Sequence, residues 1–248
     1  MIEHFQLKLA DSHMLAPGVR HLAFRRADDA PFKFTPGQFI QIHFNYDDGK
    51  PTKRSYSVGT PARDAEVATL ELAVSFVEGG AATRLLGNLE HGGTVVASGP
   101  YGRFCLMPAD ANKRYLLIAT GTGVTPYRAM LPLIERQIAE RDLQVVLLQG
   151  ARTPGELLYG DEFRAFAERH PRNFRYMPCL SRELPAAAHA DVRHGYVQQF
   201  LGESAPDAAG DIAYLCGNPN MVDACFEALK GHGLPVPQIR REKYVSSK

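Results

Sequence analysis

The chain has 248 residues, of which 45% are hydrophobic and 22% charged, and its formal net charge at pH 7 is +1. Such a composition is typical of a soluble globular protein, and the length allows one large domain or two smaller ones. The small charge argues against a broad basic surface for nucleic acid, and no apolar run is long enough to span a membrane. The N-terminus lacks the pattern of a secretory signal. We therefore expect a cytoplasmic monomer with neither nucleic acid nor a membrane as a partner.

The cysteines and histidines predict no metal site. The four cysteines, Cys105, Cys179, Cys216 and Cys225, lie far apart, whereas iron–sulfur clusters and structural zinc need closely spaced thiolates. The nine histidines form no H-E-x-x-H or H-x-H pair. Any redox chemistry must therefore come from a bound organic cofactor.

Short apolar alternations interrupted by turn residues characterise the first part of the chain. Residues 19–24, 39–44 and 70–77 alternate between apolar and polar side chains, with P-G, D-D-G and G-G turn signals around them. Patterning of period two, broken by turns, predicts an antiparallel barrel or sandwich. One short helix is expected over residues 82–89.

After residue 108, unbroken apolar runs alternate with helical patterns. Each run precedes a predicted helix: 115–119 before 126–140, 145–148 before 161–169, and 212–215 before 219–230, which Gly231 would cap. Strands buried on both faces and alternating with helices predict a doubly wound α/β domain with a parallel sheet. We place the boundary within residues 107–112, which gives domains over 1–107 and 108–248.

The segment T-G-T-G-V-T-P, residues 120–126, lies where the first strand of the second domain passes into its helix. Ligands of doubly wound sheets bind beyond the carboxyl ends of the strands. Gly121 and Gly123 allow a sharp turn and a close backbone approach, and the helix N-terminus favours an anion. Thr122 and Thr125 add hydroxyl donors. The pattern favours a pyrophosphate site; a glycine-rich connection without a ligand is the alternative.

Two arginines follow later strands of the same domain. Arg152 comes after the second apolar run, in Q-G-A-R, and Arg182 after a third predicted strand, in C-L-S-R-E. Guanidinium groups suit an extra phosphate on the adenosine ribose, whereas an unmodified ribose is usually bound by a carboxylate. We therefore favour NADP over NAD. Two solvated surface arginines are the alternative.

Cys216 and Gly217 end the last apolar run, and Asn218 is placed to cap the helix that follows. Taken alone, such a cysteine is a small buried apolar side chain. Beside a dinucleotide site, Gly217 would let a nicotinamide approach closely and Cys216 would position it. Cys225, on the helix, is expected in the core.

The segment R-S-Y-S-V-G-T-P-A, residues 54–62, combines a permanent cation, an aromatic ring and two hydroxyls in its first four positions. Taken alone, it also fits the end of a strand with a half-buried Tyr56 and a solvated Arg54. Six motifs occur in order along the chain: R-S-Y-S (54–57), G-A-A-T (80–83), G-P-Y-G-R-F (99–104), G-T-G-V-T-P (121–126), S-R (181–182) and C-G-N-P (216–219). Together they resemble the motifs of bacterial ferredoxin–NADP⁺ reductases over nearly the whole chain. The conjunction is specific for the flavoprotein reductase superfamily and less specific for the member within it.

The resemblance implies an N-terminal antiparallel β-barrel that binds FAD and a C-terminal doubly wound α/β domain that binds NADP(H). Arg54 would pair with the FAD pyrophosphate, Tyr56 would stack on the flavin, and Ser57 would hydrogen-bond near the hydride-accepting nitrogen. The short helix would begin at G-A-A-T and hold the same pyrophosphate through its N–H groups. The family motifs add these cofactor contacts: Ser55, Gly80, Ala81, Ala82, Thr83 and, beside Arg182, Ser181.

The C-terminal R-E-K-Y-V-S-S-K departs from the plant-type pattern, which ends in an aromatic residue over the flavin. It resembles the bacterial subclass with an aromatic residue shortly before the end. Here that residue is Tyr244, which would cover the flavin or the adenine and yield to the nicotinamide; a frayed chain end is the alternative. Glu242 would assist protonation, unless it is a solvated carboxylate. The candidate catalytic residues are therefore Ser57, Cys216, Glu242 and Tyr244.

The implied reaction is reversible hydride transfer between NADPH and FAD, coupled to single-electron exchange with ferredoxin or flavodoxin. An electron-transfer reductase component of an oxygenase or another redox system is the alternative, although the missing cysteine cluster argues against a fused iron–sulfur domain. A third hypothesis, from another class, is a flavin or dinucleotide sensor without catalytic activity.

Overall fold

The computed structural model describes residues 2–63, 66–185 and 189–245. The chain divides into two compact units. The first contains the described residues up to Leu106 together with Thr125–Leu133, and the second contains Met107–Val124 together with Ile134–Val245. One helix, α2 (Thr125–Arg141), therefore has its first half in the first unit and its second half in the second.

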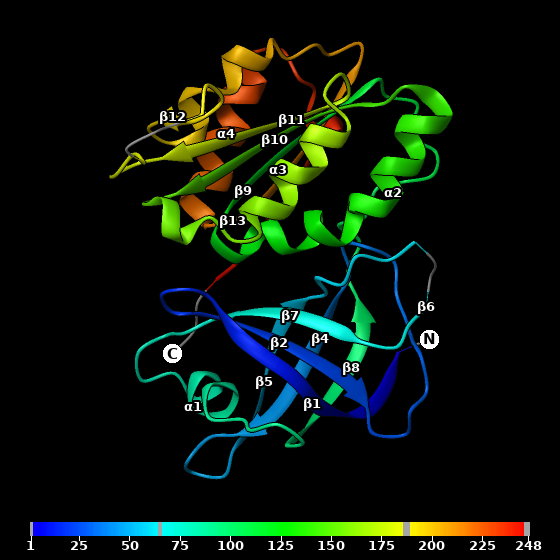
Figure 1. Cartoon of the computed structure of the whole chain (residues 1–248), viewed down its shortest axis with the longest axis vertical. Coiled ribbons are helices and arrows are strands. Elements are labelled where there is room, and N and C mark those ends of the chain that lie inside the picture. Colours follow the sequence, from blue (N-terminus) through cyan, green and yellow to red (C-terminus); the bar gives the residue numbers. More distant parts are fainter. Residues whose placement is uncertain (1, 64–65, 186–188, 246–248) are drawn as a thin grey trace. The chain divides into compact units, whose positions relative to one another are not determined.

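A closed antiparallel barrel forms most of the first unit (Figure 1). Its sheet has six strands in the order β5-β4-β8-β1-β2-β7, and every neighbouring pair is antiparallel. A bridge between Val58 and Leu72 joins the two edges and closes the sheet. The elements are β1 (Glu3–Ala16), β2 (Val19–Arg26), β3 (Phe32–Lys33), β4 (Phe39–Asn45), β5 (Pro51–Ser57), β6 (Glu66–Val67), β7 (Leu70–Ser75), α1 (Ala81–Gly87) and β8 (Thr94–Tyr101).

Alternation along the strands fills the barrel interior. Leu7 and Leu9 of β1 and Ile40 and Ile42 of β4 are at most 1% exposed, and they belong to a single apolar cluster. Each is separated from the next by a residue that faces outward, as a pleated strand requires. The predicted antiparallel barrel is confirmed. The sequence patterns found β2, β4 and β7 but missed β1 and β8.

A six-stranded parallel sheet forms the second unit, in the order β12-β11-β10-β9-β13-β14. The strands are β9 (Arg114–Thr120), β10 (Gln144–Ala151), β11 (Phe174–Leu180), β12 (Arg193–His194), β13 (Asp211–Gly217) and β14 (Ile239–Lys243). The α-helices that follow α2 are α3 (Gly160–Arg169) and α4 (Pro219–Gly231). Short 3₁₀ helices cover Gly121–Val124, Pro154–Glu156, Val197–Gln199, Leu201–Ser204 and Val236–Gln238. The predicted doubly wound parallel sheet is confirmed.

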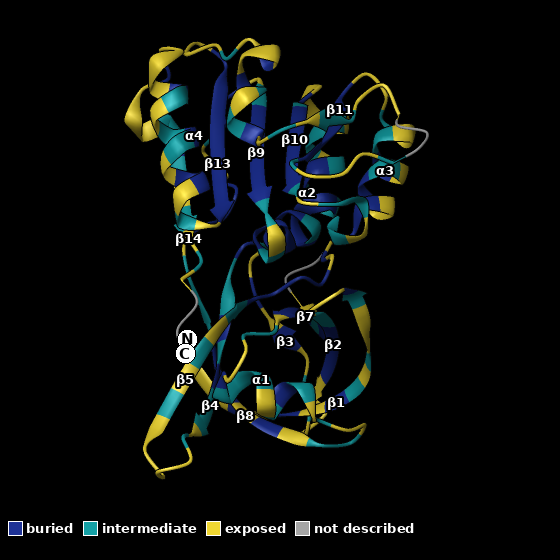
Figure 2. Cartoon of the chain, turned by 90° about the vertical axis from the view of Figure 1, so that its left-hand side faces the viewer, coloured by how far each residue is buried: buried dark blue, intermediate teal, exposed yellow. Residues whose placement is uncertain are grey.

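Helices cover both faces of this sheet, which is why its central strands are apolar throughout (Figure 2). Met177 of β11 lies in the apolar cluster that contains α4 residues such as Leu229. The preceding residue, Tyr176, points to the other face, where its ring meets that of Phe163 of α3 at a centroid distance of 5.7 Å. Helices α3 and α4 therefore lie on opposite faces of the sheet.

The strand order reverses direction at β9. From β9 the chain moves outward to β10 and β11 on one side, and later to β13 and β14 on the other. Right-handed crossovers then require helices on opposite faces, and the connections that leave β9 and β13 diverge from one point. Doubly wound sheets bind their ligands at this point.

The predicted cap of the last helix is wrong. Gly231 is still helical, and the residue that adopts a left-handed conformation is Gly233, with φ of 92°. The N–H of Leu234 bonds to the carbonyl of Leu229 at 3.0 Å, and that of Gly233 to the carbonyl of Lys230 at 2.9 Å. This ending places Leu234 in the core, and the burial of its side chain fixes which glycine turns the chain. Helix α1 also covers Ala81–Gly87 instead of residues 82–89.

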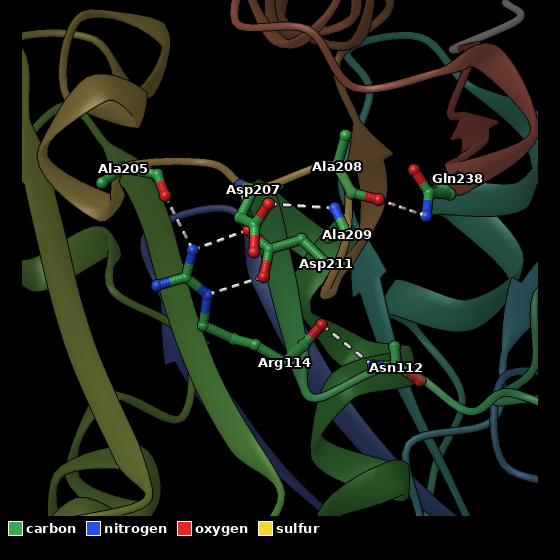
Figure 3. Close-up of polar contacts among 8 residues, drawn as sticks. All are labelled: Asn112, Arg114, Ala205, Asp207, Ala208, Ala209, Asp211 and Gln238. Atoms are coloured by element: carbon green, nitrogen blue, oxygen red, sulfur yellow. Dashed lines mark hydrogen bonds and ion pairs between the residues drawn. The ribbon is translucent and has the colours of Figure 1, made fainter.

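A buried ion pair joins the beginnings of β9 and β13 (Figure 3). The guanidinium of Arg114 donates from Nε to Oδ1 of Asp211 at 2.9 Å and from Nη2 to Oδ2 at 2.6 Å. The same carboxylate accepts from the backbone N–H of Asp207 at 2.8 Å, and Arg114 also donates to the carbonyl of Ala205. Because Asp211 is 2% exposed, these bonds offset the cost of burying its charge.

Replacement of Asp211 by alanine is therefore expected to lower the free energy of unfolding by about 2–3 kcal/mol, because Arg114 is left without its charged partner. The measurement is urea denaturation of the variant and the parent. Glu227→Ala is the matched control, since Glu227 pairs with Lys230 on the exposed surface of α4 and its loss should have a smaller effect. Equal effects of the two substitutions would contradict this account.

Candidate functional site

The ends of β9 and β13 meet at the reversal of strand order. The side-chain oxygen of Thr120, the last residue of β9, accepts a hydrogen bond from the N–H of Asn218 at 3.1 Å. The side chain of Asn218 accepts from the N–H groups of Asn220 and Met221 at 2.9 and 3.3 Å, so it caps α4 as predicted. The end of β9 and the first turn of α4 are therefore held together at this point.

Glycine is required at this point because the two strand ends pack backbone against backbone. A Cβ on Gly123 would lie 2.3 Å from the carbonyl oxygen of Cys216, and one on Gly217 would lie 2.5 Å from that of Thr120. The packing of the two strand ends is thus a sufficient reason for glycine at position 217, independent of the close approach of a nicotinamide that the sequence predicts. Gly121 differs, because it has φ of 54° and nothing within 4 Å of the Cβ position, which suits a turn that a ligand can approach.

Thr122 and Thr125, the predicted hydroxyl donors, have different surroundings. Thr122 is half-buried in the turn after β9, whereas Thr125 begins α2 and is 1% exposed. The hydroxyl oxygen of Thr125 has no hydrogen-bond partner among the described residues. A buried hydroxyl without a partner is costly, so a polar ligand group at the start of α2 would satisfy it.

Cys216, Glu242 and Tyr244 are brought together at the carboxyl ends of β13 and β14. Cys216 pairs in register with Glu242, and the N–H of Tyr244 bonds to the carbonyl of Gly217 at 2.8 Å. Tyr244 therefore belongs to an ordered strand end, while the residues beyond Val245 lie outside the described range.

Burial changes the acidity of this group. It raises the pKa of the Cys216 thiol, with a further contribution from Glu242, whereas a side-chain hydrogen bond from Tyr244 acts in the opposite direction. The pKa of Glu242 is raised by burial to about 7. Near neutral pH, Cys216 is therefore a neutral thiol, and Glu242 is poised to hold or release a proton.

Arg152 and Arg182 follow neighbouring strands at the same edge of the sheet. The N–H of Arg182 bonds to the carbonyl of Arg152 at 2.9 Å, and that of Ser181 to the carbonyl of Ala151 at 3.0 Å. Ser181 also donates its hydroxyl to Ala151 at 3.4 Å. The Arg152 side chain forms an ion pair with Glu156 at 2.5 Å. The two predicted cations are thus neighbours, together with a carboxylate that sequence analysis did not consider.

In the first unit, Arg54 lies on the edge strand β5 and its guanidinium is held by several groups. It donates to the hydroxyl of Tyr46 at 2.9 Å, to that of Thr52 at 3.0 Å and to the carbonyl of Lys53 at 2.9 Å. It also lies over the rings of Phe44 and Tyr46, 5.8 Å from each centroid. Arg54 is therefore a positioned cation and not a freely solvated one.

Tyr56 and Ser57 point to opposite faces of β5. Tyr56 packs against the barrel core, and burial raises the pKa of its phenol to about 12, so the ring remains neutral. Ser57 is 7% exposed, whereas Ser55 is exposed. Of the two serines, only Ser57 is therefore buried.

The G-A-A-T motif begins α1 as expected from the resemblance. Gly80 is the N-cap and provides no side-chain bond, which leaves the N–H groups of Ala81, Ala82 and Thr83 at the helix start. The side-chain oxygen of Thr83 accepts from the N–H of Val77 at 2.8 Å, so its own hydrogen is the group left to donate.

An ion pair connects α1 to the hairpin that carries Arg54. Arg84 of α1 binds Asp47, in the turn between β4 and β5, at 2.8 Å. The adjacent Tyr46 holds Arg54. The start of α1 and the Arg54 guanidinium therefore belong to one end of the barrel, which Figures 1 and 2 show as α1 beside β4 and β5.

These groups fit the two dinucleotides that the resemblance implies. A fixed guanidinium, an uncapped helix start and a neutral aromatic ring match the diphosphate and the ring system of FAD. A turn open at Gly121, an unsatisfied buried hydroxyl and two arginines match a nicotinamide dinucleotide. An FAD-binding barrel combined with a dinucleotide-binding parallel sheet defines a flavin-dependent oxidoreductase.

Comparison with known proteins gives the family. The oxidoreductase FAD-binding domain model matches residues 6–105, and the oxidoreductase NAD-binding domain model matches residues 117–227. A ferredoxin–NADP reductase B of Sorangium cellulosum is 37% identical, and the match covers 98% of each chain. The chain belongs to the ferredoxin–NADP⁺ reductase family, and it binds FAD and NAD(P)H.

Longer relatives match as well. The toluate 1,2-dioxygenase electron transfer component of Pseudomonas putida is 30% identical over 98% of this chain and 68% of its own length. The phenol 2-monooxygenase reductase component of a Pseudomonas species is 35% identical over 94% of this chain and 63% of its own length. The chain thus spans about two thirds of these reductase components.

Solved structures support the same fold. The Amycolatopsis reductase GcoB superposes with a TM-score of 0.83 at 30% identity, covering 98% of this chain and 70% of that one. A Neisseria gonorrhoeae ferredoxin NADP⁺ reductase with bound FAD and NADP gives 0.79 at 22% identity, covering 97% and 98%. None of the helices in the described ranges is long and apolar enough to cross a membrane.

Sequence analysis missed three polar groups of these sites: the Thr120 hydroxyl, the Tyr46 hydroxyl and the Glu156 carboxylate. The contact of Glu156 could have been predicted from the sequence, because a carboxylate four residues after an arginine such as Arg152 is a common partner. Tyr46 and Thr120 gave no local signal, since each acts on a residue that folding brings close.

The raised pKa of Glu242 predicts a pH-dependent stability. Between its ordinary value of 4.5 and about 7, the folded chain keeps the proton that the unfolded chain releases. Stability linked to this group is fully present below the lower value and is lost as the pH rises through about 7. Relative to Glu242→Gln, the parent should therefore lose free energy of unfolding between about pH 5 and about pH 8.

Denaturant titrations at several pH values measure this difference. Glu227→Gln, which removes an exposed carboxyl of α4, controls for the loss of a charge alone. Parallel curves for the parent and Glu242→Gln would show that Glu242 does not retain its proton on folding.

Proposed function

We propose that this chain is a ferredoxin–NADP⁺ reductase that exchanges a hydride with NADP(H) and single electrons with a ferredoxin or flavodoxin. The observation that carries the proposal is the Sorangium relative, because that match covers 98% of both chains. We assign FAD binding to residues 1–107 and NADP(H) binding to residues 108–248, with the chain acting as a monomer in the cytoplasm.

The first unit holds the flavin in this proposal. When bound, FAD supplies the redox chemistry, because it accepts a hydride and releases electrons singly. Arg54 and the helix start at Gly80–Thr83 bind its diphosphate, and Tyr56 packs against the ring system. Ser57 provides the hydroxyl near the reacting edge, supported by its burial within β5. The exposed Ser55 has the weakest support of the R-S-Y-S residues.

Residues after the strands of the parallel sheet orient the nicotinamide nucleotide in this proposal. Thr122, Gly123 and Thr125, which follow β9, contact the pyrophosphate, and the unsatisfied hydroxyl of Thr125 supports this role. Asn218 fixes the opposite side of the site through its bonds to Thr120 of β9 and to the start of α4, and Gly217 packs against the backbone of Thr120. Arg152, Ser181 and Arg182 bind the adenosine phosphate, which favours NADP(H) over NAD(H).

Cys216, Glu242 and Tyr244 form the part of the site where a proton is held. The neutral Cys216 thiol shapes the nicotinamide position, and Glu242 exchanges a proton at its carboxylate oxygen. Tyr244 covers the flavin or the adenine and must move before the nicotinamide can bind. Support comes from the contact of all three at the ends of β13 and β14 and from the near-neutral pKa of Glu242.

A reductase component of an oxygenase is the second candidate. The toluate dioxygenase and phenol monooxygenase components, at 30% and 35% identity, favour it. The two candidates share both nucleotide sites and differ in the protein that receives the electrons.

Electron delivery by the purified chain, reconstituted with FAD, distinguishes the candidates. Under anaerobic conditions NADPH should bleach the flavin absorbance faster than NADH does, and the reduced protein should then reduce ferredoxin or flavodoxin. Delivery to one oxygenase alone would select the second candidate. A flavin that NADPH does not reduce would instead indicate a sensor, and a chain that takes up no FAD would refute both reductase proposals.

Arg54→Ala is expected to weaken FAD binding at least about tenfold, because a charge-assisted contact with the diphosphate is lost. FAD retained after gel filtration and a fluorescence titration of the apoprotein measure the change. Lys53→Ala is the matched control, since Lys53 lies on the other face of the same strand and is exposed. Arg54→Lys should give an intermediate affinity, because it keeps the charge without the fork. Retention of FAD by Arg54→Ala at the parent level would remove this residue from the site.

A further inference from the structure

The carboxylate of Glu156 forms an ion pair with the guanidinium of Arg152, the group that we propose binds an adenosine phosphate. It accepts from Nε of Arg152 at 3.0 Å and lies 2.5 Å from Nη2, a two-point contact. Its Oε2 also accepts from the backbone N–H of Arg152 at 3.0 Å. The carboxylate is therefore held against one edge of the Arg152 fork.

Arg182 acts on the same carboxylate. The hydrogen bond from Arg152 lowers the pKa of Glu156, and the positive charge of Arg182 lowers it further. The backbone bond between Arg182 and Arg152 keeps both residues at adjacent strand ends. Two cations and one anion thus form a compact cluster beyond β10 and β11.

The ion pair is placed where a ligand can exchange with it. The Arg152 side chain is 58% exposed and that of Glu156 is 21% exposed, so water and salt reach the pair. Exposed ion pairs contribute little to stability, and a phosphate with more charge than a carboxylate can compete for the guanidinium. A ribose without a phosphate instead has hydroxyl groups, which donate hydrogen bonds to an oxygen acceptor such as a carboxylate.

We propose that Glu156 is a specificity-determining residue that competes with the adenosine 2′-phosphate for Arg152 and so moderates the preference for NADP(H) over NAD(H). The proposal rests on the proposed use of NADP(H) at this edge of the sheet. The carboxylate lowers affinity for the phosphorylated nucleotide, whereas the ribose hydroxyls of the other need only an oxygen acceptor, which a glutamine at this position also supplies.

Calorimetric binding of adenosine 2′,5′-bisphosphate and of 5′-AMP to the FAD-loaded protein tests this without electron transfer. Glu156→Gln should tighten the bisphosphate about fivefold, the scale of one exposed charge pair, and change 5′-AMP by less than about twofold. The glutamine keeps an oxygen for the N–H of Arg152, so the local turn is preserved. The ratio of kcat/KM for NADPH to that for NADH should rise by at least the same factor.

Two further variants make the test specific. Glu183→Gln removes an exposed negative charge beside Arg182 and should change neither ligand by more than about twofold. In an Arg152→Ala background, Glu156→Gln should no longer tighten binding of the bisphosphate, because the guanidinium for which the carboxylate and the phosphate compete is absent.

The proposal is overturned if Glu156→Gln leaves bisphosphate binding unchanged, tightens both ligands equally, or still acts without Arg152. Failure of the proposed function is read separately, from flavin reduction of the parent by NADPH and NADH. A parent that NADPH does not reduce refutes the reductase function, whereas the binding comparison still reports on Glu156.

Discussion

Backbone contact between the ends of β9 and β13 is the constraint on which the proposed nucleotide site depends. With no side chain at Gly123 or Gly217, the carbonyl oxygens of Cys216 and Thr120 lie only 2.3 and 2.5 Å from the positions that a Cβ would take. The helices that follow the two strands must therefore begin at one point, although they leave in different directions. A larger residue at either glycine would push the two strand ends apart. The backbone N–H groups that follow each strand would be separated as well.

The same closeness determines the acid–base character of the site. Cys216 is 0% exposed, and the strand pairing that buries it also brings Glu242 beside it. Burial penalises both anions, but the carboxyl starts from a much lower pKa than the thiol. Glu242 is consequently the member of the pair that changes its protonation near neutral pH, while Cys216 contributes shape.

Local chemistry made much of this structure predictable, and tertiary contacts account for the rest. The strands β9, β10 and β13 are continuous apolar runs, and the Asn218 cap depends on neighbouring residues, so their sequences were sufficient. The long strand β1 was missed because its register shifts between Leu9 and Asp11, which breaks the alternation that indicates a strand. β14 is charged at four neighbouring positions and is a strand only because β13 pairs with it.

The functional residues also include some that local sequence identifies and others that only tertiary contacts bring into the site. Motifs identified Arg54 and Arg152 as cations, but no motif gives the partners that set how each cation behaves. Tyr46 reaches Arg54 across the β4–β5 hairpin, and the pairing of Arg152 with Glu156 was visible only as a spacing.

Under the proposed assignments, those partners make the two arginines suited to different ligands. The hydroxyls of Tyr46 and Thr52 position the Arg54 guanidinium without cancelling its charge, because they carry none. A resident flavin that must stay bound through many turnovers benefits from such a cation. Arg152 is held by a carboxylate in an exposed position, so a phosphate gains less there than its charge alone suggests. A nucleotide that must leave after each hydride transfer is better served by that weaker attraction, since tight binding of the spent nucleotide would limit turnover.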